Sequence, residues 1–258
     1  MKTLQITKFP ELSYAGTEAI NTLCTNLTFS GDNIKRIMIT SCHASEGKTM
    51  ISMNVLRTMA KLGKKVVLVD ADLRRSVVKQ KYGLEFIEAN PAGITHLLAG
   101  MATEADCVYA TNIEGAFIVP VVKTVSQSLS LLNSDKMKEL LESLAQYFDY
   151  VIVDAPPIGA LIDAAQIARN CDGTLLVINY NAVRKKELAD ACRQLNQSGC
   201  PILGTVINQA ALDSYLNRKY YYKSYYYSHY DKYYTASDGT ERKKSPLDFI
   251  RTMFKRKK

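Results

Sequence analysis

The stretch that decides the fold runs from Arg36 to Thr49 and reads RIMITSCHASEGKT. Its first five residues form an apolar run that predicts a buried strand. A helical pattern begins at Lys48 and continues to Lys61, so the loop between joins a strand to a helix. Gly-Lys-Thr at the end of such a loop is typical of a P-loop, which holds phosphates and Mg²⁺. Cys42 replaces the leading glycine of the usual motif, but the strand–loop–helix context predicts a nucleotide-binding loop.

Apolar runs of strand length alternate with helical patterns over the first 210 residues. Strands are predicted at Arg36–Thr40, Lys65–Asp70, Ala116–Pro120, Tyr150–Asp154, Thr174–Asn179 and Ile202–Asn208, and helices at Ser13–Leu27, Lys48–Lys61, Ser134–Gln146, Ala160–Arg169 and Val183–Gln197. Nearly continuous apolar strands are typical of a sheet that is covered on both faces. The alternation therefore predicts an α/β fold with a doubly wound, mostly parallel sheet, whose ligands bind at the carboxyl ends of the strands.

Three aspartates follow two of these predicted strands. Asp70 and Asp72 lie in VVLVDADLRR, and Asp154 ends the strand in YVIVDAPP. A single aspartate after a strand is more often a helix cap or a turn former. Three of them at the edge that carries a P-loop supply hard oxygen ligands and a carboxylate that can accept a hydroxyl proton, as a Mg²⁺–triphosphate site requires.

The tyrosines are gathered near the end of the chain. Ten of the 16 lie between Tyr215 and Tyr234, in the run YLNRKYYYKSYYYSHYDKYY, with almost no apolar neighbours to pack against. Residues 215–258 also hold 12 of the 33 Lys and Arg but only 4 of the 25 Asp and Glu, so the net charge of +8 belongs to this segment. We therefore predict an α/β domain over residues 1–212 and a flexible, disordered basic tail over residues 213–258.

The cysteines and the apolar runs indicate where in the cell the protein is located. The six cysteines are scattered without a CxxC pair, the first 14 residues lack the apolar core of a signal peptide, and no apolar run approaches the length that spans a bilayer. These features favour reduced thiols and a cytoplasmic location.

Several of these stretches together resemble the bacterial tyrosine kinases of capsule and exopolysaccharide synthesis. The similar stretches are LTFSGDNIKRIMITS, the GKT loop, VVLVDADLRR, HLLAG, YVIVDAPP and DGTLLVIN, spread over roughly residues 14–210, and the tyrosine cluster completes the likeness. The resemblance implies an ATP- and Mg²⁺-dependent autokinase with the P-loop ATPase fold of the MinD and ParA proteins. Such a kinase phosphorylates clustered tyrosines on neighbouring copies and thereby regulates polysaccharide synthesis and export.

The resemblance also implies roles for single residues. The residues implied to bind the nucleotide are Ala44, Ser45, Glu46, Gly47, Lys48, Thr49 and Met50 at the phosphates and Asn208 at the adenine. Those implied to hold Mg²⁺ are Thr49, Asp72 and Asp154, and those implied in catalysis are Lys48, Asp70 as the base for the tyrosine proton, and Arg74 at the transferring phosphate. The implied acceptors are Tyr215, Tyr220, Tyr221, Tyr222, Tyr225, Tyr226, Tyr227, Tyr230, Tyr233 and Tyr234.

The chain also departs from the family pattern. Asn21 and Cys24 stand where the family commonly has two arginines that join copies into a ring, so those charged contacts are absent and the ring size is left open. Ser45 replaces a common glycine and Ser76 a common proline, changes that we expect to affect loop stiffness more than chemistry.

The resemblance implies partners as well. Because family members of this length lack the membrane-spanning activator, it implies a separate activator of the chain-length-determinant type, which recruits the chain to the inner face of the membrane, and a cognate phosphotyrosine phosphatase. The alternative is a partitioning or positioning ATPase of the ParA or MinD kind, although His43 stands where those proteins usually carry a lysine that reaches across a dimer. Nucleic-acid binding would depend on the Tyr–Lys tract alone, and we do not expect it.

Overall fold

The computed structural model describes residues 2–159 and 162–210. The strands are β1 (Lys2–Ile6), β2 (Arg36–Ser41), β3 (Val66–Asp70), β4 (Leu84–Phe86), β5 (Tyr109–Ala110), β6 (Ala116–Val119), β7 (Tyr150–Asp154), β8 (Gly173–Asn179) and β9 (Ile202–Asn208). The helices are α1 (Tyr14–Thr28), α2 (Lys48–Lys61), α3 (Val78–Tyr82), α4 (Ile94–Leu98), α5 (Glu104–Cys107), α6 (Ser128–Leu132), α7 (Asp135–Tyr147), α8 (Asp163–Ala168) and α9 (Lys185–Gln197). None of these helices is long and apolar enough to cross a membrane.

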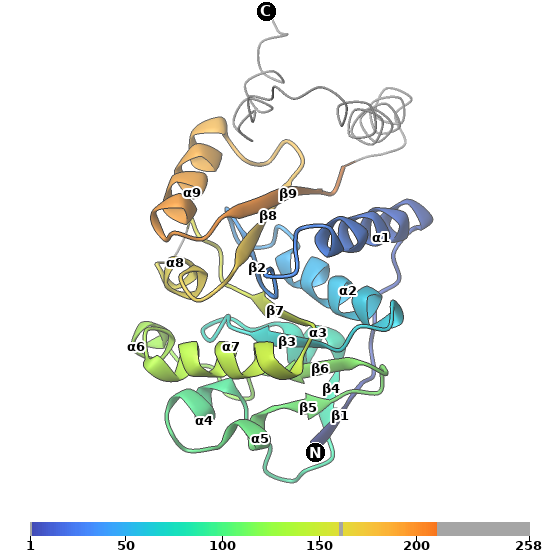
Figure 1. The fold of residues 1–258 in the computed structure, drawn as a ribbon, viewed down its shortest axis with the longest axis vertical. Coiled ribbons are helices and arrows are strands. Elements are labelled where there is room, and N and C mark those ends of the chain that lie inside the picture. The colour runs from blue at the N-terminus through green and yellow to red at the C-terminus, as the bar shows by residue number, and fades with distance from the viewer. Residues whose placement is uncertain (1, 160–161, 211–258) are drawn as a thin grey trace, which may run out of the picture. The chain divides into compact units, whose positions relative to one another are not determined.

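All nine strands join one sheet in the order β4-β1-β5-β6-β3-β7-β2-β8-β9. From β6 to β9 in this order, each strand is parallel to the next, and β1 is parallel to β5. Strand β4 is antiparallel to β1, and β5 is antiparallel to β6. The predicted mostly parallel α/β fold is therefore confirmed. In Figure 1 the helices lie on both faces of this sheet, so it is doubly wound.

Each face of the sheet has its own hydrophobic core. Successive residues of a strand point to opposite faces, and β2 shows this directly. Ile37 and Ile39 belong to the core that contains residues of α1, α2 and α3, while Met38 belongs to the core that contains residues of α4, α6, α7, α8 and α9. Because both faces are covered, the central strands need apolar residues at every position, and this explains their continuous apolar runs.

Helix α1 shows why the family's ring arginines have no counterpart here. Cys24 is fully buried in the core shared with α2, and its burial raises the pKa of the thiol to about 12. Asn21 is exposed and donates a hydrogen bond to Glu18 over 3.3 Å. Position 24 is thus a core position in this chain, and no charge is available there for a contact between copies.

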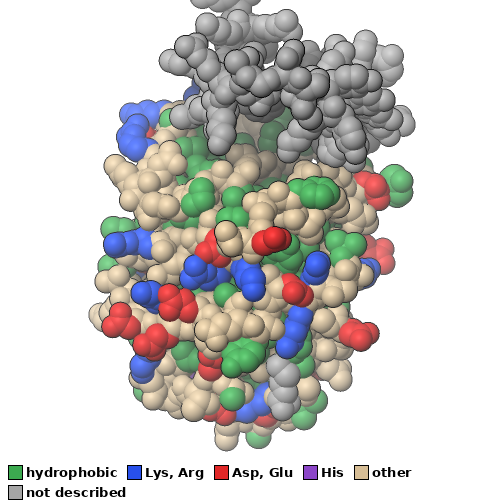
Figure 2. All heavy atoms as spheres, viewed as in Figure 1, with side chains coloured by type: hydrophobic (Ala, Val, Ile, Leu, Met, Phe, Trp, Pro, Cys, Tyr) green, Lys and Arg blue, Asp and Glu red, His purple; other side chains and the backbone are tan. Residues whose placement is uncertain are grey.

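Charges of both signs lie side by side on one face of the α/β unit. On the face shown in Figure 2, Lys and Arg side chains lie among Asp and Glu side chains. The basic tail assigned to residues 213–258, its tyrosine cluster and the domain boundary at residue 212 lie outside the described residues. They remain predictions. All six cysteines are free thiols.

Candidate active site

The predicted phosphate-binding loop lies between β2 and α2 at the carboxyl edge of the sheet. Its backbone turns through two left-handed residues, Ser45 with φ 64° and Gly47 with φ 91°, the second of which caps α2. A side chain at Gly47 would collide with Asn208, because its Cβ would lie 2.1 Å from Nδ2 of that residue. Position 47 therefore requires glycine, and the unpaired N–H groups of the first turn of α2 follow it directly, as in an anion site at a helix start.

Two side chains hold this loop in shape. Glu46 is only 2% exposed, and its carboxylate accepts hydrogen bonds from the backbone N–H of His43 over 2.7 Å and of Asn179 over 3.4 Å. Asn208 donates from Nδ2 to the Glu46 carbonyl oxygen over 2.9 Å. Asn208, implied at the adenine by the resemblance, is thus placed against the phosphate loop itself, and the ends of β8 and β9 support the loop.

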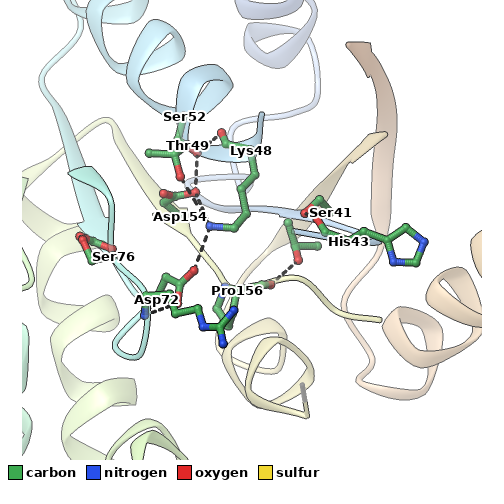
Figure 3. A network of polar contacts seen from close by, with 12 residues as sticks. Ser41, His43, Lys48, Thr49, Ser52, Asp72, Ser76, Asp154 and Pro156 are labelled. Atoms are coloured by element: carbon green, nitrogen blue, oxygen red, sulfur yellow. Dashed lines mark hydrogen bonds and ion pairs between the residues drawn. The ribbon is translucent and has the colours of Figure 1, made fainter. Parts of the chain in front are cut away.

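Lys48 lies at the centre of a buried polar cluster (Figure 3). Its Nζ is 3.1 Å from the Asp72 carboxylate and 3.8 Å from that of Asp154. Burial alone would lower the pKa of Lys48, but the carboxylates of Asp154 and Asp72 outweigh it and raise that pKa. Ser52 donates to Asp154 over 3.2 Å, and Thr49 lies beside Lys48, 3.5 Å from its Nζ.

Asp70 is the most deeply buried carboxylate of the cluster. It ends β3 directly opposite Asp154, which ends β7, and none of its surface is exposed. Burial, the charge of Asp154 and that of Asp72 raise its pKa to about 7, although a hydrogen bond from Ser76 and the charge of Lys48 oppose the rise. Ser76 therefore contacts the predicted base. The expectation that this replacement affects loop stiffness more than chemistry stays a prediction.

The cluster fits a divalent cation. Three carboxylates face one lysine, so the group has an excess of negative charge. The predicted ligands Thr49, Asp72 and Asp154 all lie around Lys48. Mg²⁺ commonly binds through one or two carboxylates together with phosphate oxygens and water, and Asp72 and Asp154 supply two such carboxylates. Among the described residues no group of three or more His, Cys, Asp and Glu side chains could hold a metal ion unaided.

Arg74 does not point freely into solvent. Its Nε donates to Ser128 over 2.7 Å and to Asp163 over 3.0 Å. Neither Ser128 nor Asp163 is predicted as a site residue from the sequence. Asp163 begins α8 and, as an aspartate at the start of a helix, looks like an ordinary first-turn residue, while Ser128 carries no recognisable signal.

The other predicted residues take peripheral places. Ala44 is exposed on the outer side of the loop, and Met50 is half-buried in the first turn of α2. The ring of His43 points away from the cluster (Figure 3) and its Nε2 lies 3.3 Å from Glu187 of α9. The ten candidate acceptor tyrosines lie outside the described residues.

The chain is similar to known proteins over most of its length. The family model described as an AAA domain matches residues 34–197. The tyrosine-protein kinase CpsD of Streptococcus pneumoniae is 39% identical over 210 residues, which cover 81% of this chain and 91% of the relative. The kinase domain of the Escherichia coli tyrosine kinase ETK superposes with a TM-score of 0.68 at 30% identity, over 76% of this chain and 77% of that domain structure.

A positioning ATPase has the same fold. The septum site-determining protein MinD of Pyrococcus horikoshii, solved with Mg-ADP, superposes with a TM-score of 0.61 at 24% identity, over 70% of this chain and 72% of its own. This likeness concerns the fold alone. It shows that the chain has a fold of MinD type.

Proposed function

Because the chain belongs to the family of bacterial tyrosine-protein kinases, we propose that it transfers the terminal phosphate of ATP to tyrosines between Tyr215 and Tyr234 of neighbouring copies. The observation that carries the proposal is the pair Asp70 and Asp154, in register at the ends of β3 and β7 beside the P-loop lysine. A buried carboxylate with a pKa near 7 is suited to accept a hydroxyl proton at neutral pH.

The reaction requires one proton transfer and one exchange of bonds at phosphorus. Asp70 accepts the proton of the tyrosine hydroxyl, and the tyrosine oxygen bonds to the terminal phosphorus. The bond from that phosphorus to the bridging oxygen breaks, and its electron pair leaves with ADP. Lys48 and the N–H groups at the start of α2 hold the phosphates and stabilise the charge that develops on them.

Mg²⁺, held by Thr49, Asp72 and Asp154, would neutralise phosphate charge and orient the terminal group. The same carboxylates contact Lys48 at 3.1 Å and 3.8 Å. Lys48, at the end of the phosphate loop, therefore contacts the proposed metal ligands and lies within reach of bound phosphates.

We further propose that this activity regulates capsular or extracellular polysaccharide synthesis, in the cytoplasm at the inner face of the membrane. The motifs shared with the capsule kinases support it. A separate membrane-spanning protein of chain-length-determinant type would recruit and activate the chain, other copies would supply and receive tyrosines, and a phosphotyrosine phosphatase would reverse the reaction.

Incubation with labelled ATP and Mg²⁺, with and without the membrane partner, followed by mapping of modified residues, tests the proposal. Phosphotyrosine between Tyr215 and Tyr234 is expected, and Lys48→Met or Asp70→Ala should abolish it. Asp172→Asn, at the opposite edge of the sheet, is the control that should leave it intact. Hydrolysis of ATP without any modified tyrosine would instead favour a positioning ATPase of MinD type.

A further inference from the structure

The most unusual charged group outside the phosphate loop is Asp163, the first residue of α8. It is only 2% exposed. Its Oδ2 accepts hydrogen bonds from the Ser128 hydroxyl and from Nε of Arg74, whereas its Oδ1 is buried and has no hydrogen-bond partner among residues 2–159 and 162–210. Burial of a carboxylate costs free energy unless it is fully paired, so an incompletely paired one calls for an explanation other than stability.

Arg74 is attached to this carboxylate by one nitrogen only. A guanidinium carries five N–H donors, and Nε of Arg74 uses one of them to contact Ser128 and Asp163. Within the described part of the chain its two terminal nitrogens make no hydrogen bond or ion pair. One third of the side chain is exposed. The terminal nitrogens therefore remain available for a ligand.

The pair Arg36 and Asp172 shows what a purely structural arginine contact looks like in this chain. Arg36 uses both Nε and Nη2 on the carboxylate of Asp172, which also accepts the backbone N–H groups of Lys35 and Arg36. This bidentate geometry occupies the edge of the guanidinium formed by Nε and Nη2. Arg74 is held through Nε alone, so both of its terminal nitrogens keep their donors.

The position of Arg74 in the chain places it at the reacting edge of the sheet. It follows Asp72 by two residues, and Asp72 lies 3.1 Å from Nζ of Lys48. Ser128 begins α6 and Asp163 begins α8, so two further elements meet the loop after β3 at this point. The arginine is thus fixed by three separate parts of the fold.

We propose that Asp163 and Ser128 are positioning residues, which hold Nε of Arg74 so that its two terminal nitrogens face the terminal phosphate of the nucleotide. The inference rests on the proposed function. Paired N–H donors in a fixed plane match two oxygens of a phosphate, and fixing the donors in advance avoids reorganisation during the transfer. Asp163 and Ser128 do not touch the nucleotide themselves.

A double-mutant cycle tests this inference. Arg74→Gln and Asp163→Asn should each lower kcat for tyrosine phosphorylation by about 10- to 100-fold, since a small misplacement of a reacting group costs this much. In the Arg74→Gln background, Asp163→Asn should lower kcat no further. An equal loss from Asp163→Asn in both backgrounds, or no loss in either, would overturn the inference. Ser128→Ala, a milder change, should behave like Asp163→Asn.

The control is Asp172→Asn, which weakens the half-buried Arg36–Asp172 pair. It should lower the thermal unfolding temperature as Asp163→Asn does, yet leave kcat unchanged. A fall in kcat that follows the loss of stability in both variants would mean that Asp163 acts only by supporting the fold.

A binding measurement separates this inference from the proposed function. Calorimetric titration with ATP and with ADP gives the ratio of the two affinities, which needs no kinase activity. Arg74→Gln and Asp163→Asn should reduce the preference for ATP by the same factor, and Asp172→Asn should not. If the unmodified chain forms no phosphotyrosine but these ratios shift as stated, the proposed function fails and the positioning of Arg74 stands. Unchanged ratios would refute the positioning.

Discussion

At the scale of single residues, Lys48 controls the charge balance of the site. It is the cation closest to Asp72 and Asp154, at 3.1 Å and 3.8 Å, and it is buried with them. Lys48→Met should abolish phosphotyrosine formation. In nucleotide-free protein it should also lower the free energy of unfolding by about 3 kcal/mol at neutral pH, because buried carboxylates then lose their counter-charge. Urea unfolding of both proteins measures this.

The control for that loss is Lys138→Met. Lys138 and Glu142 form an exposed pair 3.9 Å apart on α7, and such a pair contributes about 0–1 kcal/mol. If Lys48→Met changes the unfolding free energy no more than Lys138→Met does, the buried cluster does not depend on Lys48 as described.

A second prediction concerns Asn208, which donates to the Glu46 carbonyl of the phosphate loop. Asn208→Ala removes this bond and should lower the free energy of unfolding by about 1 kcal/mol. Because the loop then loses its support from β9, nucleotide affinity should fall as well. Fluorescence titration with a labelled nucleotide gives that affinity. A loss of stability with unchanged affinity would show that the loop keeps its shape without Asn208.

The sequence could predict which residues reach the active edge but not which ones touch. Asp70 and Asp154 end apolar runs, and the ends of parallel strands meet at one edge, so their proximity followed from the pattern. The contacts of Ser76 with Asp70, and of Asp163 with Arg74, depend on the direction of side chains in loops. No periodicity in the sequence encodes those directions.

At the scale of the elements, β2 is attached to β8 by the carboxylate of Asp172. Burial alone would raise the pKa of Asp172, but its hydrogen bonds from Arg36 and Lys35 outweigh that and lower it. A carboxyl with a lowered pKa stabilises the fold above its unfolded pKa, and the contribution disappears as the pH falls through the folded value. Asp172→Asn should therefore cost about 1–2 kcal/mol at pH 7. The difference from the unmodified chain should begin to shrink near pH 3.8, the ordinary value for Asp, and should vanish only below the lowered pKa of the folded state. Denaturant unfolding of both proteins over this pH range measures the difference in free energy of unfolding.

The elements that the sequence missed are short or lie at the edge of the sheet. The six predicted strands are all present, and helices occur at all five predicted places, with residues 160–161 outside the described range. The two-residue strand β5 and helices of four or five residues are too short for a period to emerge. Strand β1 lies near one edge of the sheet, and of its five residues only Leu4 and Ile6 are buried. Its sequence therefore lacks the continuous apolar run by which the central strands were predicted.

At the scale of the whole molecule, the distribution of charge predicts a switch in assembly. The net charge of +8 is confined to residues 215–258, which hold the candidate acceptor tyrosines. Each phosphate adds about −1.5 to −2 charges, so roughly five would cancel the excess. Phosphorylation should then drive copies apart as negative groups gather at shared active sites. Light scattering before and after phosphorylation should show a smaller particle, and an unchanged size would contradict the switch.

The register between β3 and β7 holds the carboxylates of Asp70 and Asp154 at a fixed spacing. Asp70 and Asp154 face each other across adjacent strands that are bonded along their whole length, so neither carboxylate can shift without the other. A change that separates the carboxyl ends of these strands would therefore displace the proposed base and a proposed Mg²⁺ ligand together. Because both strand ends are buried and border the phosphate loop, such a disturbance would also reach the proposed nucleotide site.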